Sequence, residues 1–165
     1  MSEERTLILD PQRMERTIER MAWEVIERHM GENEVLIVGI SNSGYKLAEK
    51  LHDAVQTQAK FNVTLGEISV NKRNPGEGPT VCKSEIGPST AVVVVDDVLN
   101  TGGTLIYAVN HFLGQHARRI TTAVLIDRNH KRFPIKADIK GLSLSTSLQE
   151  TVEVVLDKDS AAYLI

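Results

Sequence analysis

The stretch that most constrains the fold of this chain covers residues 92–104, with the sequence VVVVDDVLNTGGT. Its first four residues are apolar and β-branched, which is typical of a strand buried on both faces of a parallel sheet. A helical pattern of apolar residues follows, from Leu105 to Leu113. A strand, an acidic pair, a loop rich in Gly and Thr and then a helix form the layout of an anion site at the carboxyl end of an α/β sheet.

The loop after this strand has the residue types that a phosphate site needs. Gly102 and Gly103 lack a Cβ, so the backbone can adopt a positive φ and a ligand can approach it closely. The loop amides, and the positive dipole end of a helix beginning near Thr104, favour a phosphate dianion. The hydroxyls of Thr101 and Thr104 can donate further hydrogen bonds to phosphate oxygens.

The acidic pair, Asp96 and Asp97, suits another part of the same ligand. Ionised carboxylates repel phosphate but accept hydrogen bonds from the hydroxyls of a sugar. A ligand with a phosphate at one end and a diol about one sugar away satisfies both halves. The alternative is a capped helix after a buried strand, with both carboxylates solvated. That alternative is disfavoured because consecutive carboxylates directly after a buried strand are costly unless something pairs with them.

This stretch resembles the phosphoribosyl pyrophosphate (PRPP) signature of type I phosphoribosyltransferases. The resemblance implies an α/β fold with a mostly parallel central sheet, helices on both faces and a small hood. It also implies that Asp96 and Asp97 are the catalytic residues that hold the 2′ and 3′ hydroxyls of ribose. The residues that it assigns to the 5′-phosphate are Leu99, Asn100, Thr101, Gly102, Gly103 and Thr104.

A second strand, loop and helix unit lies upstream. Residues 35–40 predict a core strand, and apolar residues at helical spacing continue from Lys46 to Val55. The family has its pyrophosphate loop at this point in chain order, often with a basic residue that this chain lacks. A plain turn between strand and helix remains the alternative. The residues that the resemblance assigns to pyrophosphate here are Ser41, Asn42, Ser43 and Gly44.

Residues 71–89 are rich in Pro and Gly and predict a long loop, which in a compact domain is typically a mobile lid or arm. Type I phosphoribosyltransferases have a flexible loop here that closes over PRPP, and closure would exclude water from the reacting sugar. We expect Lys72 and Arg73 to meet the leaving pyrophosphate. Two solvated charges on a loop are the alternative.

A wider similarity connects the chain to the pyrimidine operon attenuators, which are both RNA-binding regulators and uracil phosphoribosyltransferases. The similar segments are residues 8–10 (ILD), 26–28 (IER), 36–40 (LIVGI), 63–68 (VTLGEI) and 125–138 (LIDRNHKRFPIKAD). The implied reaction transfers ribose 5-phosphate from PRPP to a nucleobase, with uracil favoured. The implied cofactor is Mg²⁺, held through PRPP near Asp96 and Asp97 without direct protein ligands. We expect the hood, near Ile139 and Val152, to contact the base.

Two other substrate and partner classes stay open. Purine salvage enzymes of the hypoxanthine-guanine type share the segment at residues 134–138, but they have an Asp where this chain has Asn100, which cannot accept a proton. The attenuators bind RNA through basic residues, and Glu19 and Trp23 here replace small polar and His residues of that surface. An added carboxylate repels phosphate. The basic residues that would form an RNA-binding face are Arg20, Arg28, His130, Lys131, Arg132, Lys136 and Lys140.

Composition sets broader limits. The 165 residues, 41% hydrophobic with a net charge of −3, predict a single domain over residues 1–165, without an overall basic field. We expect its hood to come from the termini and residues 135–156. One cysteine, Cys82, permits no intrachain disulfide, and no apolar run approaches the ~20 residues of a membrane span. The charged N-terminus lacks a signal peptide's apolar stretch. We therefore expect a cytoplasmic homo-oligomer without membrane contact. Trp23 does not belong to the apolar stripe of its predicted helix, and we expect it to lie at an interface.

Overall fold

The computed structural model describes residues 4–78 and 80–165. Residues 1–3, which belong to the N-terminal stretch discussed above, and Pro79 of the predicted loop lie outside the described residues. The elements in chain order are β1 (Thr6–Leu9), α1 (Pro11–Arg28), β2 (Glu34–Ile40), α2 (Ser43–Gln56), β3 (Asn62–Ser69), β4 (Val81–Cys82), β5 (Thr90–Leu99), α3 (Gly103–Gly114), β6 (Arg119–Asp127), β7 (Ile139–Ser143), β8 (Val152–Val155) and β9 (Ala161–Leu164).

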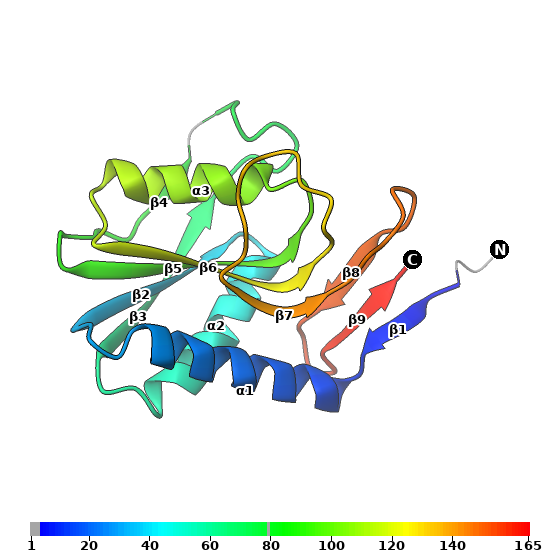
Figure 1. Ribbon diagram of the computed structural model, residues 1–165, viewed down its shortest axis with the longest axis horizontal. Helices are drawn as coiled ribbons and strands as arrows, with labels where there is room; N and C mark the ends of the chain where they lie inside the picture. Colours follow the sequence, from blue (N-terminus) through cyan, green and yellow to red (C-terminus); the bar gives the residue numbers. More distant parts are fainter. Residues whose placement is uncertain (1–3, 79) are drawn as a thin grey trace.

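The main sheet has the strand order β4-β3-β2-β5-β6-β7. Its β2–β3, β2–β5, β5–β6 and β6–β7 pairs are parallel, and the short β4 runs antiparallel at one edge. Helix α3 covers one face of this sheet, and α1 and α2 cover the other (Figure 1). The predicted fold class, a mostly parallel sheet with helices on both faces, is therefore confirmed.

The valines of β5 show why this strand lies at the centre. Val93 and Val95 pack into the core shared with α1 and α2, whereas Val92 and Val94 pack into the core beneath α3. Successive side chains of a strand point to opposite faces, so only a strand covered on both sides can bury such a run. Each fully buried valine contributes about 1.5–3 kcal/mol relative to exposure.

A second, antiparallel sheet with the order β1-β9-β8 lies beside the main one (Figure 1). It joins both terminal segments to residues 152–155. Strand β7, which the sequence places in the hood, is instead an edge strand of the main sheet. Ile139 of β7 pairs with Ala123 of β6 and is fully buried.

Two further boundaries differ from the sequence expectation. Strand β5 continues through the acidic pair to Leu99, and the loop predicted at residues 71–89 contains β4, which pairs with β3 through Ile68–Cys82 and Ser69–Val81. Within residues 4–78 and 80–165, no helix combines the length and apolar character needed to cross a membrane.

Candidate functional site

The acidic pair lies where β5 loses one neighbour and keeps the other. The β2–β5 ladder ends at Gly39–Val95, whereas the β5–β6 ladder continues to Leu99–Asp127. Asp96 and Asp97 are thus strand residues at a half-open end of the sheet, whereas the sequence predicted that the strand ends just before them. Asp96 is 5% exposed and Asp97 is half-buried.

Burial raises the pKa of Asp96 well above its ordinary value, and the neighbouring Asp97 carboxylate raises it further. Lys72 opposes this rise, because its Nζ lies 3.8 Å from Asp96 Oδ1. The same carboxylate oxygen accepts a hydrogen bond of 2.9 Å from the backbone N–H of Asp97. A buried carboxylate with so few donors favours a ligand that brings hydroxyl groups to it.

The loop after β5 has a shape that requires glycine at one position. Gly102 has a φ of +88°, and a Cβ there would stand 2.6 Å from Ile135 Cγ2. The carbonyl of Thr101 accepts backbone hydrogen bonds from Arg132 (2.8 Å) and Phe133 (3.2 Å). Helix α3 begins at Gly103, so the loop lies at the positive dipole end of this helix, as the sequence predicted.

A cavity of about 250 Å³ joins the acidic pair to this loop. Residues predicted to bind the ribose hydroxyls and residues predicted to bind the 5′-phosphate both line it, together with Lys72 from the predicted long loop. Of the predicted 5′-phosphate residues, Gly103 alone does not line it. The lining residues are Lys72, Asp96, Asp97, Val98, Leu99, Asn100, Thr101, Gly102, Thr104, Leu105 and Val124.

The predicted pyrophosphate loop approaches the same acidic pair from the other side. Helix α2 begins at Ser43, earlier than the sequence suggested. A Cβ on Gly44 would lie 2.8 Å from the carbonyl oxygen of Val95 and 3.0 Å from Asp96 Oδ1. The first turn of α2 therefore lies directly against Asp96. Ser41 connects this loop to β3, because its hydroxyl donates to Glu67 Oε1 at 2.6 Å.

Pro75 and Gly76, in the first part of the predicted long loop, lie against α3. A Cβ on Gly76 would stand 2.9 Å from the Tyr107 hydroxyl, and one on Gly103 would stand 3.5 Å from Pro75 Cγ. The structure brings Lys72 to the cavity but leaves Arg73 exposed and outside its lining. One of the two predicted cations is thus placed near the acidic pair and the other is not.

The residues predicted for base contact do not line the cavity. Ile139 is fully buried in the core shared with α1, so its predicted contact with a base is wrong. Val152 is half-buried at the start of β8, where it pairs with Leu164, and its contact with a base stays a prediction. The error for Ile139 arises because β7 belongs to the main sheet and not to the hood.

Arg128, in the similar segment at residues 125–138, has no role predicted from the sequence, and the structure shows that it connects the loop after β5 to residues 146–150. Its side chain, in a residue only 9% exposed, donates to Asn100 Oδ1 at 2.8 Å and to Thr146 Oγ1 at 3.0 Å. It also donates to the carbonyls of Ser147 (3.2 Å) and Glu150 (2.5 Å). The available signal was a charged residue at the end of a buried strand, which needs partners.

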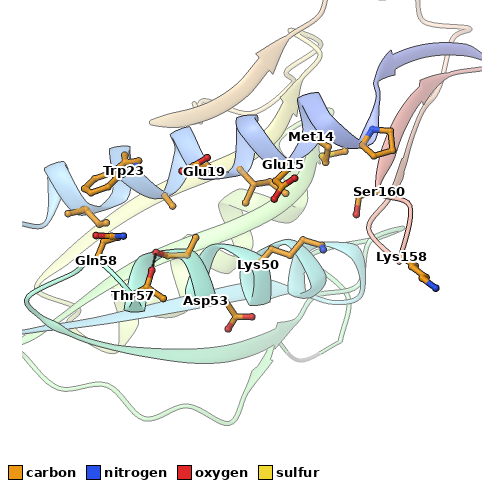
Figure 2. A pocket seen from close by; sticks show the side chains of 15 residues that line it. Met14, Glu15, Glu19, Trp23, Lys50, Asp53, Thr57, Gln58, Lys158 and Ser160 are labelled. Atoms are coloured by element: carbon orange, nitrogen blue, oxygen red, sulfur yellow. Dashed lines mark hydrogen bonds between the residues drawn. The ribbon is translucent and has the colours of Figure 1, made fainter.

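A larger cavity, of about 640 Å³, lies between α1 and α2 and contains none of the predicted PRPP-site residues. Glu15, Glu19 and Trp23 of α1 and Lys50 and Asp53 of α2 are among the residues that line this groove (Figure 2). Trp23 is 47% exposed. Across the described ranges, no group of three or more His, Cys, Asp or Glu side chains is arranged to hold a metal ion.

Comparisons with known proteins agree with this geometry. The profile of the phosphoribosyl transferase domain matches residues 5–158. "Bifunctional protein PyrR" of Bacillus velezensis is 36% identical over 166 residues, covering 94% of this chain and 92% of that protein. The protein of the same name from Bacillus subtilis is 34% identical over 166 residues, with the same coverage of 94% and 92%.

Solved structures of purine enzymes share the fold. A hypoxanthine phosphoribosyltransferase from Staphylococcus aureus has a TM-score of 0.76 at 17% identity and covers 89% of this chain and 80% of its own. A hypoxanthine-guanine phosphoribosyltransferase from Bacillus anthracis has a TM-score of 0.76 at 15% identity and covers 99% and 100%. At such identities the likeness concerns the fold alone.

Proposed function

The chain belongs to the phosphoribosyl transferase domain family, and from this premise we propose that it transfers ribose 5-phosphate from PRPP to a nucleobase and releases pyrophosphate. Uracil is the favoured acceptor because of the resemblance to the pyrimidine operon attenuators. The observation that carries the proposal is the single cavity that contains both carboxylates and the Gly/Thr loop, with the first turn of α2 against Asp96.

The residues divide the ligand by charge. Asp96 and Asp97 accept hydrogen bonds from the ribose hydroxyls, and their negative charge favours the positive charge that develops at the sugar carbon. Loop residues 99–104 hold the 5′-phosphate through backbone amides and threonine hydroxyls. The beginning of α2, with Ser41–Gly44, and the ammonium of Lys72 receive the leaving pyrophosphate. Holding base and sugar carbon in line supplies much of the acceleration.

Mg²⁺ fits this arrangement as a cofactor. Among the described residues that line the cavity, Asp96 and Asp97 are the carboxylates, and Mg²⁺ is commonly bound by one or two carboxylates together with substrate phosphates. The ion would be held through PRPP, beside Asp96 and Asp97. When bound, the ion neutralises negative charge on the leaving group.

The direct test measures pyrophosphate release from PRPP and Mg²⁺ with each of uracil, cytosine, hypoxanthine, guanine, xanthine and adenine in turn. We expect release, and formation of the matching nucleoside monophosphate, with uracil. Activity with hypoxanthine or guanine alone would move the assignment to the purine enzymes. No release with any base, from a protein that binds PRPP, would leave a nucleotide-binding protein without transferase activity.

RNA binding is the second candidate function, supported by the proximity of basic residues on α1 and β7. Arg20 donates to the carbonyls of Lys140 (3.2 Å) and Gly141 (2.6 Å), and Arg28 donates to that of Asp138 (3.0 Å). These contacts bring Arg20 and Arg28 of α1 beside the backbone of residues 138–141, the segment that carries Lys140. Binding of a structured pyrimidine-operon leader RNA that weakens steeply with salt would support this function. Equal binding of an unrelated RNA would contradict it.

We also propose a homo-oligomer, supported by the exposed Trp23 in the groove between α1 and α2. Exposed aromatic surface of this kind marks interaction sites. Light scattering coupled to gel filtration measures the mass in solution. A monomer at micromolar concentration would contradict the proposal.

A further inference from the structure

The side-chain amide of Asn100 has its orientation fixed by Arg128. A guanidinium carries only donors, so the atom of Asn100 that lies 2.8 Å from Arg128 Nη1 must be the oxygen Oδ1. A flipped amide would place its NH₂ group against the guanidinium, donor against donor. The Nδ2 group is therefore the part of the amide left for another partner, and it has none among residues 4–78 and 80–165.

Arg128 is itself held in place, which makes this orientation rigid. Its Nε and Nη2 atoms bind Thr146 and the carbonyls of Ser147 and Glu150, all in the segment between β7 and β8. A nearly buried guanidinium with four acceptors loses several hydrogen bonds if it moves. The orientation of the Asn100 amide therefore depends on residues 146–150 as well as on the phosphate loop.

Asn100 lies on the side of the cavity where an incoming base has to be. The expected pyrophosphate residues, Ser41–Gly44, follow β2, which neighbours β5 on one side. Arg128 follows β6, which neighbours β5 on the other side. In an in-line displacement the entering and leaving groups occupy opposite sides of the sugar carbon. A leaving group near α2 therefore places the base near Asn100, which lines the cavity.

We propose that Asn100 Nδ2 donates a hydrogen bond to a carbonyl oxygen of the nucleobase, and that Arg128 is the positioning residue that makes this amide a donor. This inference rests on the proposed phosphoribosyl transfer. It adds a specificity determinant: the site selects bases with a carbonyl acceptor on the edge that faces the loop. A protein whose side chain at position 100 carries only hydrogen-bond acceptors does not distinguish such bases from others.

The first experiment uses the unmodified protein and compares uracil with 2-thiouracil and 4-thiouracil, because sulfur is a weaker hydrogen-bond acceptor than oxygen. We expect kcat/KM to fall about tenfold for one of the two analogues, as loss of about one hydrogen bond requires. If the base panel selects hypoxanthine, 6-mercaptopurine replaces these probes. Equal kcat/KM for uracil and both analogues would overturn the inference.

The second experiment uses Asn100→Asp, which keeps an oxygen for Arg128 and removes the donor. Its control is Asn110→Asp, the same chemical change on the exposed face of α3. We expect the discrimination between oxygen and sulfur to shrink from about tenfold to less than about twofold in Asn100→Asp only. The KM for the base should rise more than the KM for PRPP. Unchanged discrimination would overturn the inference.

The role of Arg128 is tested with Arg128→Met and Arg128→Lys. We expect the Met variant to lose the discrimination between oxygen and sulfur and the Lys variant to recover part of it, because an ammonium still donates to Asn100 Oδ1. Full discrimination in a folded Arg128→Met variant would overturn the positioning role. Failure of the parent protein to release pyrophosphate with any base would instead reject the proposed function, so the two failures are distinguishable.

Discussion

Replacing Gly102 with alanine tests the phosphate loop with a magnitude that follows from two separate features. The φ of +88° disfavours any residue with a Cβ by about 1–2 kcal/mol. The new methyl group would also stand 2.6 Å from Ile135 Cγ2. Isoleucine is branched at Cβ and cannot swing aside freely, so this overpacking costs about 1–3 kcal/mol more. The expected loss in the free energy of unfolding is about 2–5 kcal/mol.

Gly78 provides a matched control, because it has a φ of +81° but nothing within 4 Å of the position of a Cβ. Gly78→Ala should therefore show the backbone cost alone, about 1–2 kcal/mol. Urea unfolding followed by circular dichroism measures both variants. A second readout is the KM for PRPP, which should rise for Gly102→Ala because the loop amides move away from the phosphate.

The comparison refutes the reasoning if Gly102→Ala loses no more stability than Gly78→Ala. In that case Ile135 relaxes without cost, and the contact does not fix the loop. A stability loss without any change in the KM for PRPP would keep the packing argument and remove the loop from the phosphate site.

Three other substitutions probe the acidic pair and its surroundings. Asp97→Asn should abolish pyrophosphate release while leaving the circular dichroism spectrum and urea midpoint close to those of the parent; retained turnover would contradict the ribose assignment. Lys72→Met removes the ammonium that lowers the pKa of Asp96, so this pKa should rise further. Because Asp96 must be ionised to accept hydrogen bonds from two hydroxyls, the acid limb of the pH profile of kcat/KM should move to higher pH. An unmoved acid limb would show that Asp96 does not control it. Gly44→Ala places a Cβ 2.8 Å from a backbone oxygen of β5 and 3.0 Å from Asp96 Oδ1, and should lower the free energy of unfolding by about 1–3 kcal/mol. The control is Gly31→Ala, which has nothing within 4 Å of its Cβ and should change stability little. Equal losses in the urea unfolding of both variants would contradict the packing argument.

The centre of the fold could be predicted from the sequence because its signals are local. Four consecutive valines in β5 require cover on both faces, and the glycines after them mark a loop with a left-handed residue, as Gly102 confirms. Both signals act within a few residues, and tertiary packing has little room to reverse them.

The errors concern features that depend on distant partners. Whether Asp96 lies in a strand or a loop depends on how far β6 extends beside it, and β6 begins more than twenty positions later in the chain. Nothing in the sequence near Ile139 indicates that it pairs with Ala123 of β6, so local pattern alone does not place it in the main sheet. The four acceptors of Arg128 are likewise supplied by Asn100 and a segment far along the chain. No local pattern around these residues contains that information.

The order of strands in the main sheet accounts for the order of functions across the site. Strands β2, β5 and β6 are adjacent and parallel, so the segments that follow them emerge at one edge, side by side. The turn after β2 brings the beginning of α2 against Asp96, β5 itself carries the carboxylates, and β6 ends in Arg128, which binds Asn100. For the proposed function, a ligand along this edge meets the N-terminal end of α2, which suits an anion, then carboxylates that suit a diol, and then the Asn100 amide proposed as a donor. PRPP and a base with a carbonyl group have this sequence of chemistry, and a purely structural use of these residues would give no reason for it.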